Sequence, residues 1–296
     1  RRDLRLTDNA ALAAALQSCA QVHCVFILDR AILDPLPRAD RRVEFIRESL
    51  AAMDAQLRAL GEAAHTGLIV RHGWAEEDIP ALAQTLGVDA VFCAQDYEPQ
   101  AIARDAQVQF ALARLRKAWV SVKDHVVFER SELLTQAGKP YGVFTPYKNA
   151  WLKKVDSYYL QAHAVAPHAG ALAAKPAGTP PMPTLAGMGF EKTNLEAMKL
   201  PTGISGGAQL YQEFLERIDL YDETRNFPAV KGPSYLGVHL RFGTVSIREL
   251  AAEGLKRQDS GSAGAAVWLS ELIWRDFYVQ VLHNFAHVGQ GKSFKP

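Results

Sequence analysis

The chain has 296 residues, of which 48% are hydrophobic and 22% are charged, and its formal net charge is +1. This balance is typical of a folded globular protein and excludes a chain that is disordered throughout. The length fits one large domain or two ordinary ones, and a net charge this small points to no particular partner, so any basic surface must be local. Because no apolar run approaches ~20 residues, we expect no membrane-spanning helix and no membrane partner.

The three cysteines, Cys19, Cys24 and Cys93, form no C-x-x-C pair and lie in or beside apolar segments. This pattern predicts buried free thiols in a reducing cytosol, hence a cytoplasmic protein, and it argues against a metal site or a disulfide framework. The opening residues 1–6 do not look like a natural start, so we expect the chain to be clipped there.

Residues 1 to about 130 alternate short, apolar, β-branched runs with longer segments whose apolar residues recur every three or four positions. Such alternation predicts a parallel sheet covered by helices on both faces. The predicted strands span 22–28, 68–70 and 88–92, and the predicted helices span 42–60, 76–86 and 99–117.

Residues 162–188 are rich in Ala, Pro and Gly and cannot hold a long helix or a sheet ladder. From residue 206 onward the spacing is helical, with a long helix expected over 263–284. The predicted fold class is therefore α/β. It comprises a doubly wound, Rossmann-like parallel-sheet domain, a long linker and the first part of an all-α domain, with ranges 1–128, 129–205 and 206–296.

Two familiar motifs fail on context. Gly203–Gly207 matches the G-x-S-x-G nucleophile elbow, but residues 198–202 before it are no strand, so we reject a serine hydrolase and expect a helix start capped by Ser205. Gly291–Ser293 lacks the earlier glycine of a phosphate-binding P-loop and is rejected as well.

Four segments bear on function, and the first two are structural in character. Arg2–Leu12 is a basic, polar turn that enters an Ala-rich helix, with Thr7 or Asp8 as the expected cap. Tyr141–Trp151 is rich in aromatic residues, and we interpret it as a packed aromatic corner in preference to a catalytic element.

The third segment joins Tyr221–Ala229, which contains Arg225, to Ser234–Ser246. Small hydroxyls and backbone N–H groups beside a helix start form a site suited to an anion.

The fourth segment, Trp268–Tyr278, has helical spacing and is apolar on nearly all sides, so we expect a buried helix in which Glu271, Trp274 and Tyr278 share one face. A Glu and an Arg in such a helix are costly unless they are paired. The residues alone favour an intrahelical ion pair between Glu271 and Arg275, with the tryptophans as core.

In this order, the four segments resemble the photolyase/cryptochrome family, and among its members the class I photolyases that act on cyclobutane pyrimidine dimers. The resemblance extends over nearly the whole chain. It implies a deoxyribodipyrimidine photo-lyase, in which light-excited reduced FAD gives one electron to a dimer flipped out of damaged DNA.

The family pattern also has a strand before residue 1 and a longer region after residue 296. We therefore expect a chain truncated at both ends, which binds FAD poorly and is inactive by itself.

The resemblance assigns FAD binding to one set of residues: Tyr221, Arg225, Ser234, Tyr235, Leu236, Gly237, Trp268, Glu271 and Arg275. The sequence departs from the family pattern at Pro233 and Gly237, where two hydroxyl donors are lost. The predicted phosphate site is weakened by these changes.

The same resemblance places the repair chemistry on two side chains. Trp274 is expected to stack on the flipped dimer, and Glu271 to hydrogen-bond a base and stabilise the developing radical anion. Contact with the damaged DNA is expected from Glu271, Trp274, Arg275 and Tyr278.

A second, light-harvesting chromophore is common in this family. Gln100-Ala101 stand where folate-binding members carry Asn-Glu, so the resemblance favours a deazaflavin, with Arg42, Asp96 and Glu98 as the antenna residues.

Three alternatives stay open at this point. A cryptochrome-type photoreceptor would share the fold and the flavin without repair, and a (6-4) photolyase would need histidines beyond residue 296. A non-enzymatic α/β module that binds a small cofactor or a partner would suit a chain that is short in nature. We expect a monomer.

Overall fold

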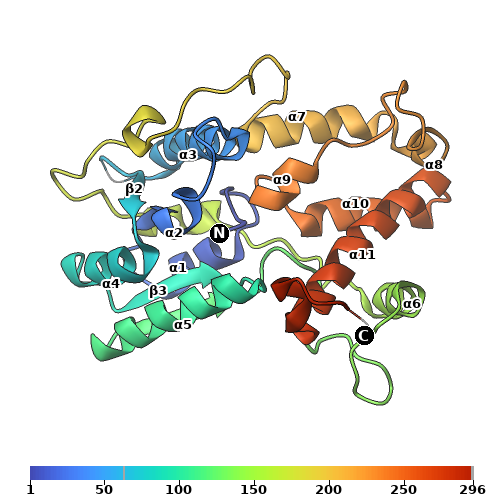
Figure 1. Cartoon of the computed structure of the whole chain (residues 1–296), viewed down its shortest axis with the longest axis horizontal. Coiled ribbons are helices and arrows are strands. Elements are labelled where there is room, and N and C mark those ends of the chain that lie inside the picture. Colours follow the sequence, from blue (N-terminus) through green and yellow to red (C-terminus); the bar gives the residue numbers. More distant parts are fainter. Residues whose placement is uncertain (63, 295–296) are drawn as a thin grey trace.

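The computed structural model describes residues 1–62 and 64–294. The α/β elements lie on one side of the molecule and the later helices on the other (Figure 1). The strands are β1 (Cys24–Asp29), β2 (Leu68–Gly73), β3 (Ala90–Ala94) and β4 (Ala118–Val122). The helices among and around them are α1 (Ala10–Ser18), α2 (Arg30–Leu33), α3 (Arg41–Leu60), α4 (Ala75–Thr85) and α5 (Pro99–Arg114).

The strands pair in parallel, as the alternation of strand and helix patterns predicts. Cys24 lies opposite Leu68 in the β1–β2 pair, and Ala90 lies opposite Ala118 in the β3–β4 pair. The described residues form two separate two-stranded sheets, with α1 against β3 and β4.

The fourth strand is a correction to the sequence analysis, which extended the preceding helix to residue 117. Helix α5 ends at Arg114, and Arg116 then takes a left-handed conformation (φ 55°) that turns the chain into β4.

The range predicted to be a linker, 129–205, contains the whole of helix α6 (Phe144–Lys154) and the first residues of a second helix, which begins at Gly203. Residues 162–188 carry only the 3-10 turns η1 (Ala166–Ala171) and η2 (Ala186–Met188), which confirms that this stretch holds no long helix. Two isolated bridges, Val22–Leu172 and Thr66–Ala174, bring the stretch back onto the α/β elements. The domain boundaries at 128 and 205 stay a prediction.

The helical part consists of α7 (Gly203–Leu215), η3 (Ile218–Leu220), α8 (Tyr221–Thr224), α9 (Gly237–Phe242), α10 (Ile247–Asp259), α11 (Ala263–Asn284) and η4 (Ala286–Gln290). Helix α11 has the bounds that its spacing predicts. No helix among the described residues is long and apolar enough to cross a membrane.

Two predicted helix caps are wrong. Helix α7 already begins at Gly203, whose N–H donates to the Ser49 hydroxyl (3.2 Å), so Ser205 lies inside the first turn. Helix α1 is capped by Asn9, one residue beyond Asp8. The Asn9 side-chain oxygen accepts a hydrogen bond from the Leu12 N–H at 2.9 Å.

Two large apolar cores hold the molecule together. The first surrounds α11 and includes Phe214, Leu250, Leu269 and Trp151. The second joins α3 and the β1–β2 pair to the opening residues and to the stretch after α6, as Leu4, Leu50 and Phe190 illustrate. The chain between β4 and α7 therefore contributes to both cores.

Buried charges connect the start of the chain to α10. Asp124, with no exposed surface, accepts hydrogen bonds from the guanidinium groups of Arg5 (2.8 Å) and Arg248 (3.0 Å). Arg248 also binds the carboxylate of Asp8 at 2.8 Å. Burial opposes the charge on Asp124, yet the two arginines hold the pKa of Asp124 below its ordinary value.

The three cysteines are free, as predicted, and each is partly rather than fully buried. Burial raises the pKa of Cys24 to about 12 and that of Cys93 to about 11, which keeps both groups in the thiol form.

Candidate functional site

Helix α11 presents one polar and aromatic face outward while its remaining surface fills the core. Its N-terminus is capped by Ser262, whose hydroxyl accepts from the Ala265 N–H at 3.1 Å. Leu269 and Ile273 have no exposed surface, whereas Tyr278 is 62% exposed. Because residues three and four apart share a helix face, Glu271, Trp274 and Tyr278 are brought together as predicted.

Glu271 is paired, but not with the residue that the sequence suggests. Its carboxylate accepts a hydrogen bond from the guanidinium of Arg225 at 2.7 Å, so the intrahelical pair with Arg275 is not the one that forms. Arg225 also lies over the ring of Tyr221, 5.2 Å from its centroid. The hydrogen bond to Glu271 raises the pKa of Arg225.

Arg275 points away from this face. Its guanidinium donates to the backbone carbonyls of His125 and of Leu240, the latter at 3.4 Å. Burial is the main reason that the pKa of Arg275 falls to about 10. The structure therefore uses Arg275 to tie α11 to the segment after β4 and to α9, and does not bring it to the predicted DNA face.

Trp274 stands in a stack of aromatic rings. Its ring lies 3.6 Å from that of Phe144, with only 8° between the planes, and 5.4 Å from that of Tyr278. In the same segment as Phe144, Tyr147 and Trp151 are each 1% exposed and belong to the core around α11. The interpretation of residues 141–151 as a packed aromatic corner is confirmed.

The predicted flavin residues divide into a buried group and an accessible group. Trp268 is 3% exposed and packs on Phe214, which also meets Tyr221 edge to face, so Trp268 supports Tyr221 from within the core. Leu236 is likewise buried.

Ser234, Tyr235 and Gly237 lie at the start of α9. The Ser234 hydroxyl accepts weakly from the Leu236 N–H (3.4 Å), and Tyr235 is 47% exposed in a left-handed conformation (φ 57°). A Cβ added at Gly237 would meet nothing within 4 Å, so the space beside this backbone is open.

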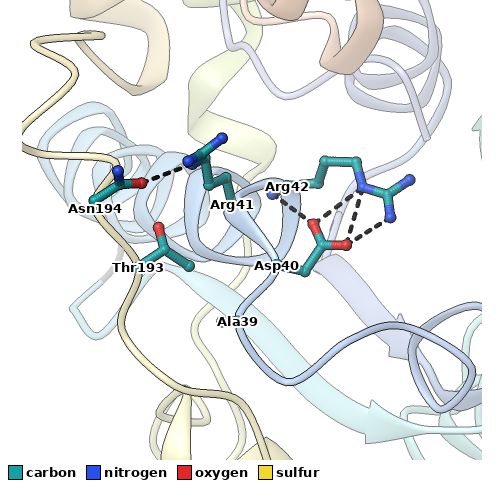
Figure 2. Close-up of a pocket in the computed structure, with 6 residues that line it drawn as sticks. All are labelled: Ala39, Asp40, Arg41, Arg42, Thr193 and Asn194. Atoms are coloured by element: carbon teal, nitrogen blue, oxygen red, sulfur yellow. Dashed lines mark hydrogen bonds and ion pairs between the residues drawn. The ribbon is translucent and has the colours of Figure 1, made fainter.

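The predicted antenna residues take part in two separate sets of ion pairs. Arg42 forms its ion pair with Asp40, at 2.5 Å, in a surface depression at the start of α3 (Figure 2). Asp96 lies within 3.9 Å of Arg1 and Arg2, and Glu98 binds Arg2 and also Arg241, the latter at 2.9 Å. In the part of the chain that the structure describes, direct ionic contact thus joins Asp96 and Glu98 through Arg2 but does not reach Arg42.

Sequence reasoning missed Asp276, which is 1% exposed. Its Oδ2 accepts hydrogen bonds from the Val127 N–H (3.0 Å), the Phe128 N–H (3.2 Å) and the Trp151 indole N–H (3.2 Å). Burial raises the pKa of Asp276 to about 6. The sequence does contain a signal for this site, namely an acidic residue within a helical segment that is apolar on most sides. Such a residue needs hydrogen-bond partners from outside the helix.

The sequence model of the DNA photolyase family matches residues 1–169, more than half of the chain. The chain belongs to the DNA photolyase family. A deoxyribodipyrimidine photo-lyase from Synechococcus is 33% identical over 98% of this chain and 61% of its own length.

Solved photolyase structures share this fold. A bacterial class III photolyase from Agrobacterium tumefaciens superposes with a TM-score of 0.81 at 26% identity, over 98% of this chain and 59% of that one. An archaeal photolyase from Sulfolobus tokodaii, solved with two FAD molecules, gives a TM-score of 0.73 at 25% identity, over 97% of this chain and 59% of that one. The chain thus spans about three fifths of the length of these relatives.

Proposed function

We propose that this chain serves in the light-driven repair of cyclobutane pyrimidine dimers in DNA, with reduced FAD as the electron donor. The observation that carries the proposal is the outward face of α11, where a fixed indole, a carboxylate and an exposed tyrosine lie side by side. A flipped base needs a flat apolar surface to stack on and a polar group to read its edge, and this face offers both. Membership of the photolyase family supports the same reaction.

Trp274 and Glu271 divide the recognition of the lesion between them. Stacking of a base on an aromatic ring contributes about 1–3 kcal/mol, and Trp274 is the ring to which we assign this role. The Glu271 carboxylate can accept an N–H of the stacked base, while the hydrogen bond from Arg225 holds that carboxylate in place. Arg225 also places a positive charge beside the site, where a DNA phosphate or the negative charge on a dimer that has received an electron would be stabilised.

We assign the start of α9, together with Tyr221 and Arg225, to the binding of a flavin dinucleotide. The first backbone N–H groups of a helix have no partner within it, and the open space beside Gly237 allows phosphate oxygens to approach them. The Ser234 hydroxyl and the Arg225 guanidinium add donors. When bound and reduced, FAD supplies one electron to the dimer on illumination and receives it back after the ring has split.

A second chromophore in the α/β part is a further proposal, supported by the Sulfolobus photolyase that was solved with two FAD molecules. A deazaflavin bound by Arg42, Asp96 and Glu98 stays a prediction. Any ligand there would compete with ion pairs that these side chains already make.

The proposal is tested in the full natural chain that carries this sequence, photoreduced with FAD and mixed with an oligonucleotide that contains one thymine dimer. We expect loss of the dimer under blue light and none in darkness. Glu271→Ala should lower the repair yield per photon several-fold while FAD stays bound, because the flipped base loses the acceptor that orients it in the site.

Glu196→Ala is the matched control, because it also removes a carboxylate from an ion pair, here the exposed pair with Lys192. The control should repair as the parent does. A parent protein that holds reduced FAD but leaves the dimer intact in light would contradict the proposal and favour a photoreceptor or a (6-4) enzyme.

A further inference from the structure

We propose that Phe144 is a positioning residue, which holds the Trp274 indole in the orientation needed to stack on a flipped base. The inference rests on the proposed function and adds a residue from helix α6 to the site. The ring planes of Phe144 and Trp274 are 8° from parallel and their centroids are 3.6 Å apart. One face of the indole is therefore covered by the phenyl ring.

Further aromatic contacts restrict both rings. Phe277 meets Trp274 edge to face at 5.6 Å and meets Phe144 in the same way at 5.9 Å. Phe277 is itself 5% exposed and anchored in the core. Rotation of the indole about its side-chain bonds would break the contacts with both phenyl rings, so a single rotamer is favoured.

Phe144 can act in this way because α6 is fixed to α11 at a second point. Trp151, seven residues and about two turns further along α6, donates its indole N–H to Asp276 at 3.2 Å. Asp276 in turn lies two residues after Trp274 on α11. The two helices are thus joined by an aromatic stack near the surface and a buried hydrogen bond below it, and neither can turn about its axis without breaking one of them.

The consequence for the site is pre-organisation. An indole free to change rotamer loses that freedom when a base stacks on it, and the loss weakens binding. A ring already held by Phe144 avoids most of that cost. Phe144 should therefore strengthen binding of a flipped lesion without touching it, and should have little influence on undamaged duplex, whose bases stay stacked.

The experiment compares Phe144→Ala and Phe144→Leu with Phe144→Tyr, which keeps an aromatic ring. Phe110→Ala removes a 65% exposed phenyl ring from α5 and is the matched control. Near-ultraviolet circular dichroism reports the environment of Trp274, whose share is identified by comparison with Trp274→Phe. Fluorescence anisotropy measures binding of dimer-containing and undamaged oligonucleotides to the FAD-loaded full natural chain.

We expect Phe144→Ala and Phe144→Leu to alter the Trp274 signal and to lower the preference for the dimer about three- to tenfold, in line with the loss of one aromatic pair. Phe144→Tyr should keep the Trp274 signal and the preference for the dimer close to those of the parent. Phe110→Ala should change neither the signal nor the preference. Phe144→Leu keeps an apolar side chain at position 144. Unchanged far-ultraviolet circular dichroism spectra and an unchanged melting temperature show that a variant is folded.

An unaltered Trp274 signal in folded Phe144→Leu overturns the positioning role, as does an altered signal with an unchanged preference for the dimer. If the parent protein binds dimer-containing and undamaged DNA equally well, the result contradicts the proposed function. The role of Phe144 in lesion binding is then contradicted as well. The spectra then still decide whether Phe144 fixes the ring.

Discussion

The two oxygens of the Asp276 carboxyl group are in different situations. Oδ2 accepts three N–H donors, whereas the buried Oδ1 meets no hydrogen-bond partner in the described residues. The three donors stabilise the charged form, but they do not offset the loss of water around it, and the pKa of Asp276 rises from 3.8 to about 6. This group is therefore poised to change charge just below neutral pH.

The free energy of unfolding of the chain should therefore depend on pH through the titration of Asp276. A carboxyl group with a raised folded-state pKa stabilises the fold most when it is protonated, and this contribution is lost as the pH rises through about 6. Asp276→Asn cannot ionise. Between pH 5 and pH 7.5, the free energy of unfolding of the parent relative to Asp276→Asn should fall by about 1 kcal/mol.

Urea unfolding of both proteins at the two pH values measures this difference. Asp259→Asn, at the exposed end of α10, serves as control and should show no comparable change relative to the parent. If the free energies of unfolding of the parent and of Asp276→Asn differ by the same amount at both pH values, Asp276 does not titrate in this range.

At the scale of single elements, the turn that ends α9 has a demanding geometry. Gly243 has a φ of 72°, and a Cβ there would lie 1.9 Å from the carbonyl oxygen of Arg2. The Leu4 N–H donates to the Phe242 carbonyl at 3.2 Å, and Arg5 donates to the Gly243 carbonyl. The opening residues can lie this close to α9 only because residue 243 has no side chain.

Gly243→Ala should accordingly destabilise the chain by several kcal/mol, since it adds a backbone collision to the strain of a left-handed alanine. Gly138→Ala separates the two effects. Gly138 has a φ of 69°, but nothing lies within 4 Å of the added Cβ. Gly138→Ala should therefore lower the free energy of unfolding by only about 1–2 kcal/mol. Denaturant unfolding of the two variants measures the difference, and equal losses would show that the close approach to Arg2 is unimportant.

Elements with a strong period could be predicted from the sequence, and those set by distant contacts could not. The bounds of α11 follow from its apolar spacing, and the shared face of Glu271, Trp274 and Tyr278 follows with them. Strand β4 was missed because no Gly or Pro marks the turn at Arg116.

The contacts that the site residues make with distant parts of the chain could not be predicted from local sequence patterns. Glu271 binds Arg225, 46 residues earlier in the chain, and Phe144 stacks on Trp274 from 130 residues away, so the spacing within α11 carries no trace of either contact. Local sequence therefore identified which side chains share a face, while long-range packing decided what each of them meets.

At the scale of the whole molecule, one buried carboxylate joins three parts of the chain. Asp124 follows β4, Arg5 belongs to the opening segment and Arg248 to the first turn of α10. The Asp124 carboxylate also accepts from the Ala10 N–H at 3.0 Å, at the start of α1. Without Asp124, two guanidinium groups would stay buried with one fewer negative charge between them.

Asp124→Asn should therefore cost about 3–5 kcal/mol of unfolding free energy, as is usual when one partner of a buried ion pair is removed. Asp34→Asn breaks the exposed pair with Arg30 and should cost less than about 1 kcal/mol. Thermal and denaturant unfolding of the two variants provides the comparison. Similar losses for both would indicate that the buried network adds nothing beyond a surface ion pair.

The path of the chain between the two cores restricts how the molecule can move. After β4 the chain enters the α11 core at Val127 and Phe128, returns to the α3 core with Val165 and Leu172, and passes back to the α11 core along α7, at Phe214. Several crossings of the chain and the Asp124 network thus join the two cores. Relative movement of the two cores would have to bend every crossing segment and break these buried ion pairs, so we expect it to be small.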